Sequence, residues 1–182
     1  GLTLGDNAKF IIWNAFALST NVESLSFKNI DFVGAINEQF ETRPIENETS
    51  KSFSAKQVFN ENGSNTTLNS LTFTNCSFKS FRALVRLQAA NDGVRNVLFK
   101  GCTINGTGDQ GTVSTNNKGG TMDNITFEDC TITNVVLLGD LRSTVNIPTF
   151  NIIDCTFCYA PLEGTGNPVS YTHLTLPTTE RV

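Results

Sequence analysis

The sequence predicts an all-β fold, a right-handed parallel β-helix of about five coils that is truncated at its ends. Three observations lead to this fold class. A short motif recurs along the 182-residue chain, its copies are evenly spaced, and the segments between copies are rich in Thr, Asn and Ser. Such residues suit a chain that must turn every few residues.

The motif reads apolar-x-apolar-x-[Asn/Asp/Gly]-[Cys/Ile]-x-apolar. Its five copies are residues 25–32, 71–78, 97–104, 125–132 and 150–157. In the second copy, Leu71 and Phe73 alternate, so both side chains lie on one face of a strand. Cys76 and Phe78 also alternate, but Cys76 comes three residues after Phe73, so strict alternation is broken once.

A residue that tolerates the left-handed conformation stands at each break. These residues are Asn29, Asn75, Gly101, Asp129 and Asp154. The pattern therefore predicts two short strands joined by a one-residue bend that keeps both apolar faces inward.

The spacing between copies predicts stacking. Cys76, Cys102, Cys130 and Cys155 are separated by 26, 28 and 25 residues, and Ile30 precedes Cys76 by 46. The long interval fits one coil with a surface-loop insertion near residues 37–51. A leucine-rich repeat would need a Leu-x-x-Leu-x-Leu pattern, which the sequence lacks.

Each coil needs a third strand before the next copy of the motif. The candidates are residues 10–18, 54–59, 83–89, 112–116 and 136–142. In these strands Phe10, Ile12, Phe16, Val85, Leu87, Leu137 and Leu141 are expected to point inward. The residues expected to point outward, and so to bind a ligand, are Trp13, Lys56, Arg86, Gln88, Ser114, Asp140 and Arg142.

Four of the five cysteines occupy the same motif position, so they should form an inward stack. The prediction is a ladder of buried, reduced thiols that behave as small apolar side chains. Cysteines of neighbouring coils would be close enough to form disulfides, so disulfide bonds within the stack are an alternative. Cys155 and Cys158 should lie on opposite strand faces, and without a second pair no metal site is expected.

Residues 169–182 carry none of the repeat pattern. The segment starting at Ser170 matches the translation of a sequencing-library adapter, so residues 169–182 are expected to be an artefact without a fold, leaving residues 1–168 as the β-helix domain. The only histidine, His173, belongs to this segment.

The net charge and the distribution of apolar residues limit the kinds of partner that the chain is expected to bind. The net charge is −4 and no apolar run is long enough to span a membrane, so neither nucleic acid nor a membrane span is expected. A monomer is expected, with coils at both ends that need a cap.

The motif copies at 71–78 and 125–132, with residues 81–88 between them, resemble the pectate-lyase-like β-helix superfamily, and in particular β-helix modules of gut-bacterial surface lipoproteins. The resemblance covers about residues 8–168. It implies export to the periplasm or cell surface and a polysaccharide or oligosaccharide ligand. The sequence lacks the Asn-Thr-Asp, Asp-Asp and Gly-His-Gly clusters of the superfamily's polygalacturonases, so no catalytic motif is carried over.

Three functions remain open. The first is a non-catalytic carbohydrate-binding or scaffolding module, which needs no cofactor. The second is a polysaccharide lyase acting on uronates, with Arg86 at its centre and Arg142 in support, for which Ca²⁺ would be a suitable cofactor. The third is an adhesin-like stack of coils with a purely structural role.

Overall fold

The computed structural model describes residues 8–12, 15–34, 55–61, 65–89, 91–107, 111–115, 120–135, 137–141, 148–158 and 169–175. The regular elements among these residues are all strands, and the chain winds into a right-handed parallel β-helix. Four complete turns are present among these residues, with a partial turn before and after them. The predicted fold class is confirmed.

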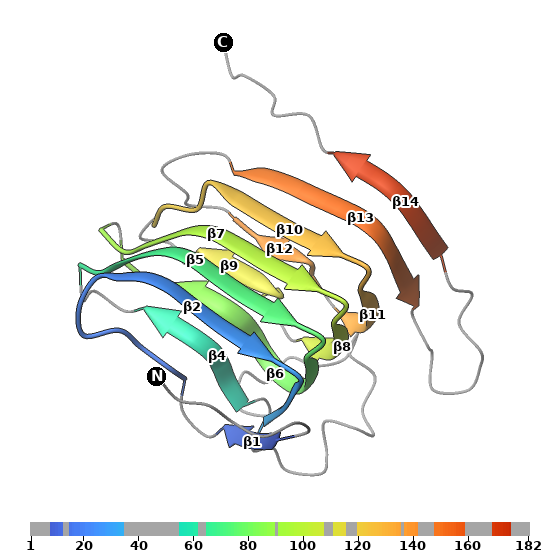
Figure 1. Ribbon diagram of the computed structural model, residues 1–182, viewed down its shortest axis with the longest axis horizontal. Coiled ribbons are helices and arrows are strands. Elements are labelled where there is room, and N and C mark those ends of the chain that lie inside the picture. Colours follow the sequence, from blue (N-terminus) through green and yellow to red (C-terminus); the bar gives the residue numbers. More distant parts are fainter. Residues whose placement is uncertain are drawn as a thin grey trace.

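Three faces run along the solenoid (Figure 1). The first sheet contains β2 (Val22–Lys28), β5 (Thr67–Thr74), β7 (Gly93–Lys100), β10 (Asn124–Glu128) and the first half of β13 (Thr149–Cys158). The second sheet contains β1 (Ala8–Ile12), β3 (Ile30–Gly34), the start of β6 (Ser77–Leu87), β8 (Thr103–Thr107), β11 (Thr131–Val135) and the second half of β13. The third sheet contains β4 (Ala55–Glu61), the end of β6, β9 (Val113–Thr115) and β12 (Gly139–Asp140).

The bend between the first and second sheets is made as the motif predicts. Each of the five break positions has a positive φ: 54° at Asn29, 50° at Asn75, 61° at Gly101, 54° at Asp129 and 51° at Asp154. One left-handed residue turns the chain through the corner, and the apolar residues on both sides remain inside.

Stacked phenylalanines fill the core. Ring centroids of Phe73 and Phe99 are 5.1 Å apart, and those of Phe99 and Phe127 are 4.9 Å apart, both pairs stacked. Phe32 and Phe78 stack in the second sheet at 5.1 Å. Because parallel in-register strands place equivalent residues above one another, one Phe per coil yields a continuous aromatic column.

Two expectations about the third strands are wrong. Residues 10–18 were expected to form one such strand, but Phe10–Ile12 belong to β1, which pairs with β3 in the second sheet, whereas Phe16 bridges to Phe59 in the third. Leu137 does not point into the core but is 44% exposed, because it precedes the two-residue strand β12 and the inward alternation does not extend to it. Phe10, Phe16 and Leu141 pack against the core as expected.

The insertion near 37–51 lies outside the described residues. Within the segment 169–182, residues Val169–Thr175 form β14, which pairs antiparallel with β13 (red in Figure 1). The proposed adapter origin of this segment concerns where the sequence came from and stays a prediction.

Candidate functional site

A line of polar residues crosses the third sheet along the solenoid axis. Asn60 of β4 pairs with Arg86 of β6, Arg86 pairs with Ser114 of β9, and Ser114 pairs with Asp140 of β12. These four residues, named here the polar column, contribute an amide, a guanidinium, a hydroxyl and a carboxylate on successive coils. Neighbouring strands in a sheet are about 4.8 Å apart, so the column presents one polar group per coil at that repeat.

Alternation in β6 sets the orientation of Arg86. Val85 and Leu87 on either side are fully buried, and Arg86 itself is partly exposed on the opposite face. Gln88 joins the column from the end of the same strand, since its Nε2 donates to Oδ1 of Asn60 at 2.8 Å. Its backbone N also donates to the carbonyl of Glu61 at 2.8 Å, which anchors the strand end to the preceding coil.

Ser114 and Asp140 lie at the register positions that the outward prediction gives them, but they are buried. Ser114 is 2% exposed and Asp140 is 8% exposed. Strand alternation determines which face of a sheet a residue occupies, whereas its exposure depends on what packs over that face. The accessible part of the polar column among the described residues is therefore its Asn60–Arg86–Gln88 end.

Three more residues, Lys56, Trp13 and Arg142, complete the predicted set of site residues. The backbone of Lys56 belongs to β4, within the third sheet. Trp13 and Arg142 lie outside the described residues. The structure thus brings together Asn60, Arg86, Gln88, Ser114 and Asp140, of which Asn60 was not predicted.

Two buried carboxylates were missed by sequence reasoning. Glu61 is fully buried; its Oε1 accepts from the backbone N of Leu18 at 2.6 Å, and its Oε2 accepts from Oγ1 of Thr66 at 2.8 Å. Asp92, also buried, accepts from the backbone N of Asn65 at 3.1 Å. Both carboxylates satisfy turn backbone between coils, so their contacts indicate a structural role.

Burial raises the pKa of Glu61, and the charge of Asp92 adds to the increase, against the lowering effect of the hydrogen bonds from Leu18 and Thr66. A sequence signal was available, because Glu61 ends the apolar strand that contains Val58 and Phe59 at a position that alternates with Phe59.

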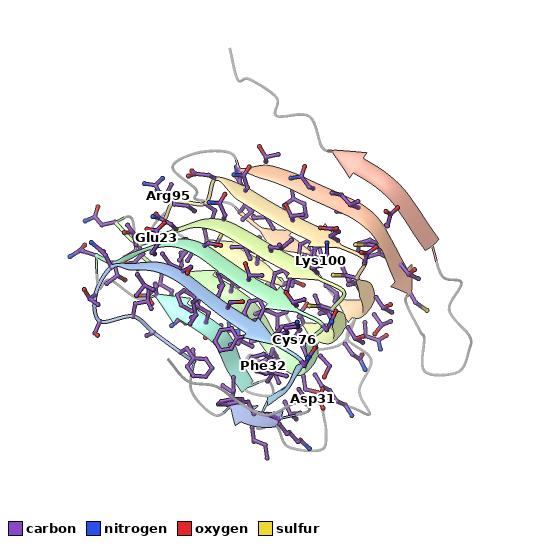
Figure 2. The ribbon with its side chains drawn as sticks, in the orientation of Figure 1. Glu23, Asp31, Phe32, Cys76, Arg95 and Lys100 are labelled. Atoms are coloured by element: carbon purple, nitrogen blue, oxygen red, sulfur yellow. The ribbon has the colours of Figure 1, made fainter. Side chains whose placement is uncertain are left out.

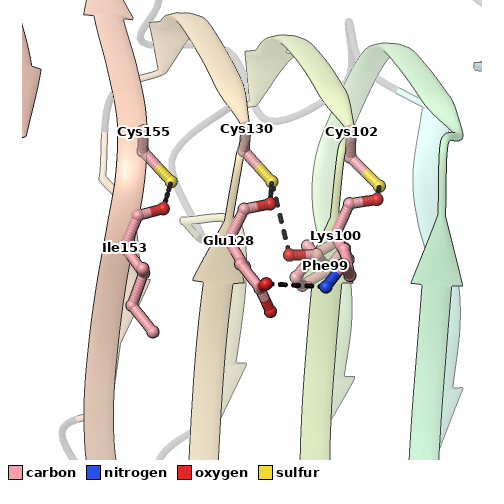
Figure 3. Close-up of polar contacts among 7 residues, drawn as sticks. All are labelled: Phe99, Lys100, Cys102, Glu128, Cys130, Ile153 and Cys155. Atoms are coloured by element: carbon pink, nitrogen blue, oxygen red, sulfur yellow. Dashed lines mark hydrogen bonds and ion pairs between the residues drawn. The ribbon is translucent and has the colours of Figure 1, made fainter. Parts of the chain in front are cut away.

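The cysteine ladder is confirmed as a stack of buried free thiols: Cys76, Cys102, Cys130 and Cys155 (three of them in Figure 3). Sγ of Cys102 donates to the carbonyl of Phe73 in the preceding coil at 3.4 Å, and Sγ of Cys130 donates to that of Phe99 at 3.4 Å. A hydrogen bond to Cys130 is the main reason why the pKa of Cys102 is raised, with burial adding to it. The ladder therefore joins adjacent coils and is closed to solvent.

Two ion pairs lie on the first sheet. Arg95 and Asp123 approach to 3.4 Å, and Lys100 and Glu128 to 2.6 Å. The hydrogen bond and the charge of Glu128 raise the pKa of Lys100. Figure 2 places Arg95 near Glu23 at one end of the first sheet, and Lys100 toward the bend that carries Cys76.

The polar column offers hydrogen-bond donors and acceptors along the third sheet. A glycoside hydrolase uses two carboxyl groups that flank the scissile bond. The column as described contains one, from Asp140. Among the described residues, no three His, Cys, Asp or Glu side chains gather as metal ligands would, and no helix has the length and apolar character needed to cross a membrane.

Comparisons with protein-family models, curated proteins and solved structures found no match to this chain.

Proposed function

We propose that this chain is a secreted or cell-surface β-helix module that binds a polysaccharide along the outer face of its third sheet, without catalysing a reaction. The observation that carries the proposal is the polar column, which offers one polar group on each of four successive coils. A polymer that lies along the solenoid axis would meet a repeated set of donors and acceptors. The column's mixture of amide, guanidinium, hydroxyl and carboxylate matches the hydroxyl and carboxylate groups of a glycan.

Arg86 is the residue expected to contribute most. It is the cation of the column, it is partly exposed, and it lies beside Asn60 and Gln88, whose amides hydrogen-bond each other at 2.8 Å. A guanidinium forms strong paired hydrogen bonds with a carboxylate. Uronate-containing polysaccharides are therefore the favoured ligands. The resemblance to pectate-lyase-like modules of gut-bacterial surface lipoproteins supports the same ligand class and export from the cell, although fold alone does not determine function.

A polysaccharide lyase is the second candidate. In lyases of this superfamily a basic residue removes the proton beside the uronate carboxylate, and Arg or Ca²⁺ neutralises that carboxylate. The observation that favours it is the shared register of Arg86 and Asp140, with Ser114 between them. Arg142 would support Arg86 in this scheme.

The test is retention on immobilised polysaccharides combined with ultraviolet absorbance of unsaturated uronate ends. Wild-type protein is compared with Arg86→Ala and with Arg95→Ala, which removes the same charge from the first sheet, where Arg95 pairs with Asp123. Retention that is at least about tenfold weaker in Arg86→Ala and unchanged in Arg95→Ala supports the binding module, since a charged hydrogen bond contributes about 1.5–3 kcal/mol.

Unsaturated product that disappears in Arg86→Ala would establish the lyase instead. Neither retention nor product with any of the uronate or neutral glycans would leave the adhesin-like stack of coils as the function.

A further inference from the structure

The side chains of Asn60 and Gln88, named here the amide pair, hydrogen-bond each other beside Arg86. Nε2 of Gln88 donates to Oδ1 of Asn60 at 2.8 Å. Asn60 lies directly opposite Arg86 in the pairing of β4 with β6. Gln88 follows Arg86 by two residues, so strand alternation places both on the same face. Arg86 therefore has one amide beside it on the preceding coil and a second amide beyond it along its own strand.

The backbone on both sides of this contact is fixed to neighbouring segments. The backbone N of Asn60 donates to the carbonyl of Phe16 at 2.9 Å, and that of Gln88 donates to the carbonyl of Glu61 at 2.8 Å. The hydrogen bond between the two amides then fixes the orientation of their side chains. Groups that are held in one geometry before a ligand arrives lose less conformational freedom on binding. The amide pair is therefore preorganised.

The amide pair retains hydrogen-bonding groups that it does not use internally. A primary amide carries two N–H donors and one carbonyl acceptor. Both side chains are partly exposed, and among the residues that the structure describes, Nδ2 of Asn60 and Oε1 of Gln88 make no hydrogen bond. One donor group and one acceptor thus remain for a ligand next to the guanidinium of Arg86.

Hydroxyl groups are the chemical match for this combination. An ionised carboxylate only accepts hydrogen bonds and an ammonium group only donates them, whereas a hydroxyl does both. Neighbouring strands are about 4.8 Å apart, and two residues along a strand span about 6.6 Å. These separations are comparable to the span of one pyranose unit. A carboxylate on Arg86 and hydroxyls on the amide pair can therefore belong to the same uronate unit.

We propose that the amide pair determines specificity by recognising the free secondary hydroxyls of the uronate whose carboxylate binds Arg86, an inference that rests on the glycan-binding function proposed above. The module then prefers uronans whose hydroxyls carry no acyl group. O-acetylation removes the proton that Oε1 of Gln88 accepts and adds bulk beside Asn60. A site that hydrogen-bonds a hydroxyl discriminates against a ligand that lacks it, because the group on the protein is left without its partner.

The first experiment changes the ligand and leaves the protein intact. Isothermal titration of wild type with polygalacturonate, and with the same polymer after O-acetylation of its secondary hydroxyls, compares two ligands that carry the same carboxylates. The Kd should be at least about fivefold lower for the unmodified polymer, since one or two hydrogen bonds are lost on acetylation. Binding of both polymers with equal Kd would overturn the proposal.

The second experiment removes the amide pair. Asn60→Ala with Gln88→Ala should bind both polymers with the same Kd, close to that of wild type for the acetylated polymer. Gln88→Met, which keeps an unbranched side chain of similar length, should lose part of the preference. The matched control is Asn96→Ala with Asn124→Ala, which removes an amide pair from the first sheet, where Nδ2 of Asn124 donates to Oδ1 of Asn96 at 2.7 Å. The control should keep the full preference of wild type.

The outcomes separate this inference from the function on which it rests. If the preference persists in a folded variant without the amide pair, Asn60 and Gln88 only join neighbouring coils and the inference is wrong. If wild type binds both polymers equally and Arg86→Ala weakens both, the binding module stands and only the role of the amide pair is refuted. If wild type binds neither polymer, the binding module and the inference fail together.

Discussion

At the scale of single residues, the ionisation of Glu61 links the stability of the fold to pH. The carboxyl is buried and its pKa lies above the ordinary value of 4.5, chiefly because burial disfavours its charged form. The folded chain therefore binds this proton more tightly than the unfolded chain. The stability it contributes is fully present below the ordinary value and is lost as the pH rises through the raised value.

We expect the free energy of unfolding of wild type, relative to that of Glu61→Gln, to fall as the pH increases. Glutamine keeps an acceptor for Leu18 and offers a donor to Thr66, so the variant removes the charge and retains the contacts. Urea unfolding of both proteins from about pH 4 to about pH 8 measures the difference. A constant difference over that range would show that Glu61 does not titrate there.

Thr115 provides a second test at this scale. Its Oγ1 is buried without a hydrogen-bond partner in the part of the chain that the structure describes. Thr115→Val replaces the hydroxyl by a methyl group of similar size, so we expect the free energy of unfolding to rise by about 1 kcal/mol. Thr66→Val is the matched control, because the equally buried Thr66 donates to Glu61 at 2.8 Å. This control should lower the free energy of unfolding by about 1.5–3 kcal/mol.

At the scale of elements, the left-handed bend decides whether β10 and β11 can follow each other in one coil. Asp129 has a φ of 54° and its side chain is exposed. The presence of Asp at this position is therefore explained by the left-handed backbone conformation and not by side-chain packing. Asp129→Val should lower the free energy of unfolding by about 1–2 kcal/mol, since a β-branched side chain is strained in this region. Asp129→Gly should be close to neutral.

Thr131→Val is the control for that pair of variants. Thr131 is exposed in the extended strand β11, where a β-branched residue fits, so its replacement should change stability by less than about 0.5 kcal/mol. Urea denaturation of the three variants measures the differences. Equal losses in Asp129→Val and Asp129→Gly would mean that the Asp side chain, and not the bend, provides the stability.

At the scale of the whole molecule, stability comes from contacts between neighbouring coils. Phe99 is fully buried between Phe73 and Phe127, whereas Phe10 is partly exposed in the first partial turn. Phe99→Ala should therefore cost about 3–5 kcal/mol, and Phe10→Ala clearly less. Thermal and urea unfolding should show the same ranking. A similar loss at both positions would argue against additive stacking of coils.

Much of the fold follows from the sequence because its causes are local. Apolar alternation around Phe73 and Cys76, one left-handed residue at Asn75, and repetition every 25–28 residues are enough to predict two inward strands per coil and their stacking. The free thiol ladder follows from the same repetition. The expected outward positions of Arg86 and Gln88 follow from the buried Val85 and Leu87.

Tertiary structure decided the features that depend on which segments meet. The pairing of β4 with β6 aligns Asn60 with Arg86. Alternation predicted an outward orientation for Arg86, Ser114 and Asp140 alike, but in the folded chain Ser114 and Asp140 are buried. The folded structure also shows that β1 belongs to the second sheet and that Leu137 is exposed. Glu61 lies between the backbone of Leu18 and the hydroxyl of Thr66. The physical reason is that alternation and bends are properties of a few consecutive residues, whereas burial and pairing depend on residues from different coils that only folding brings together.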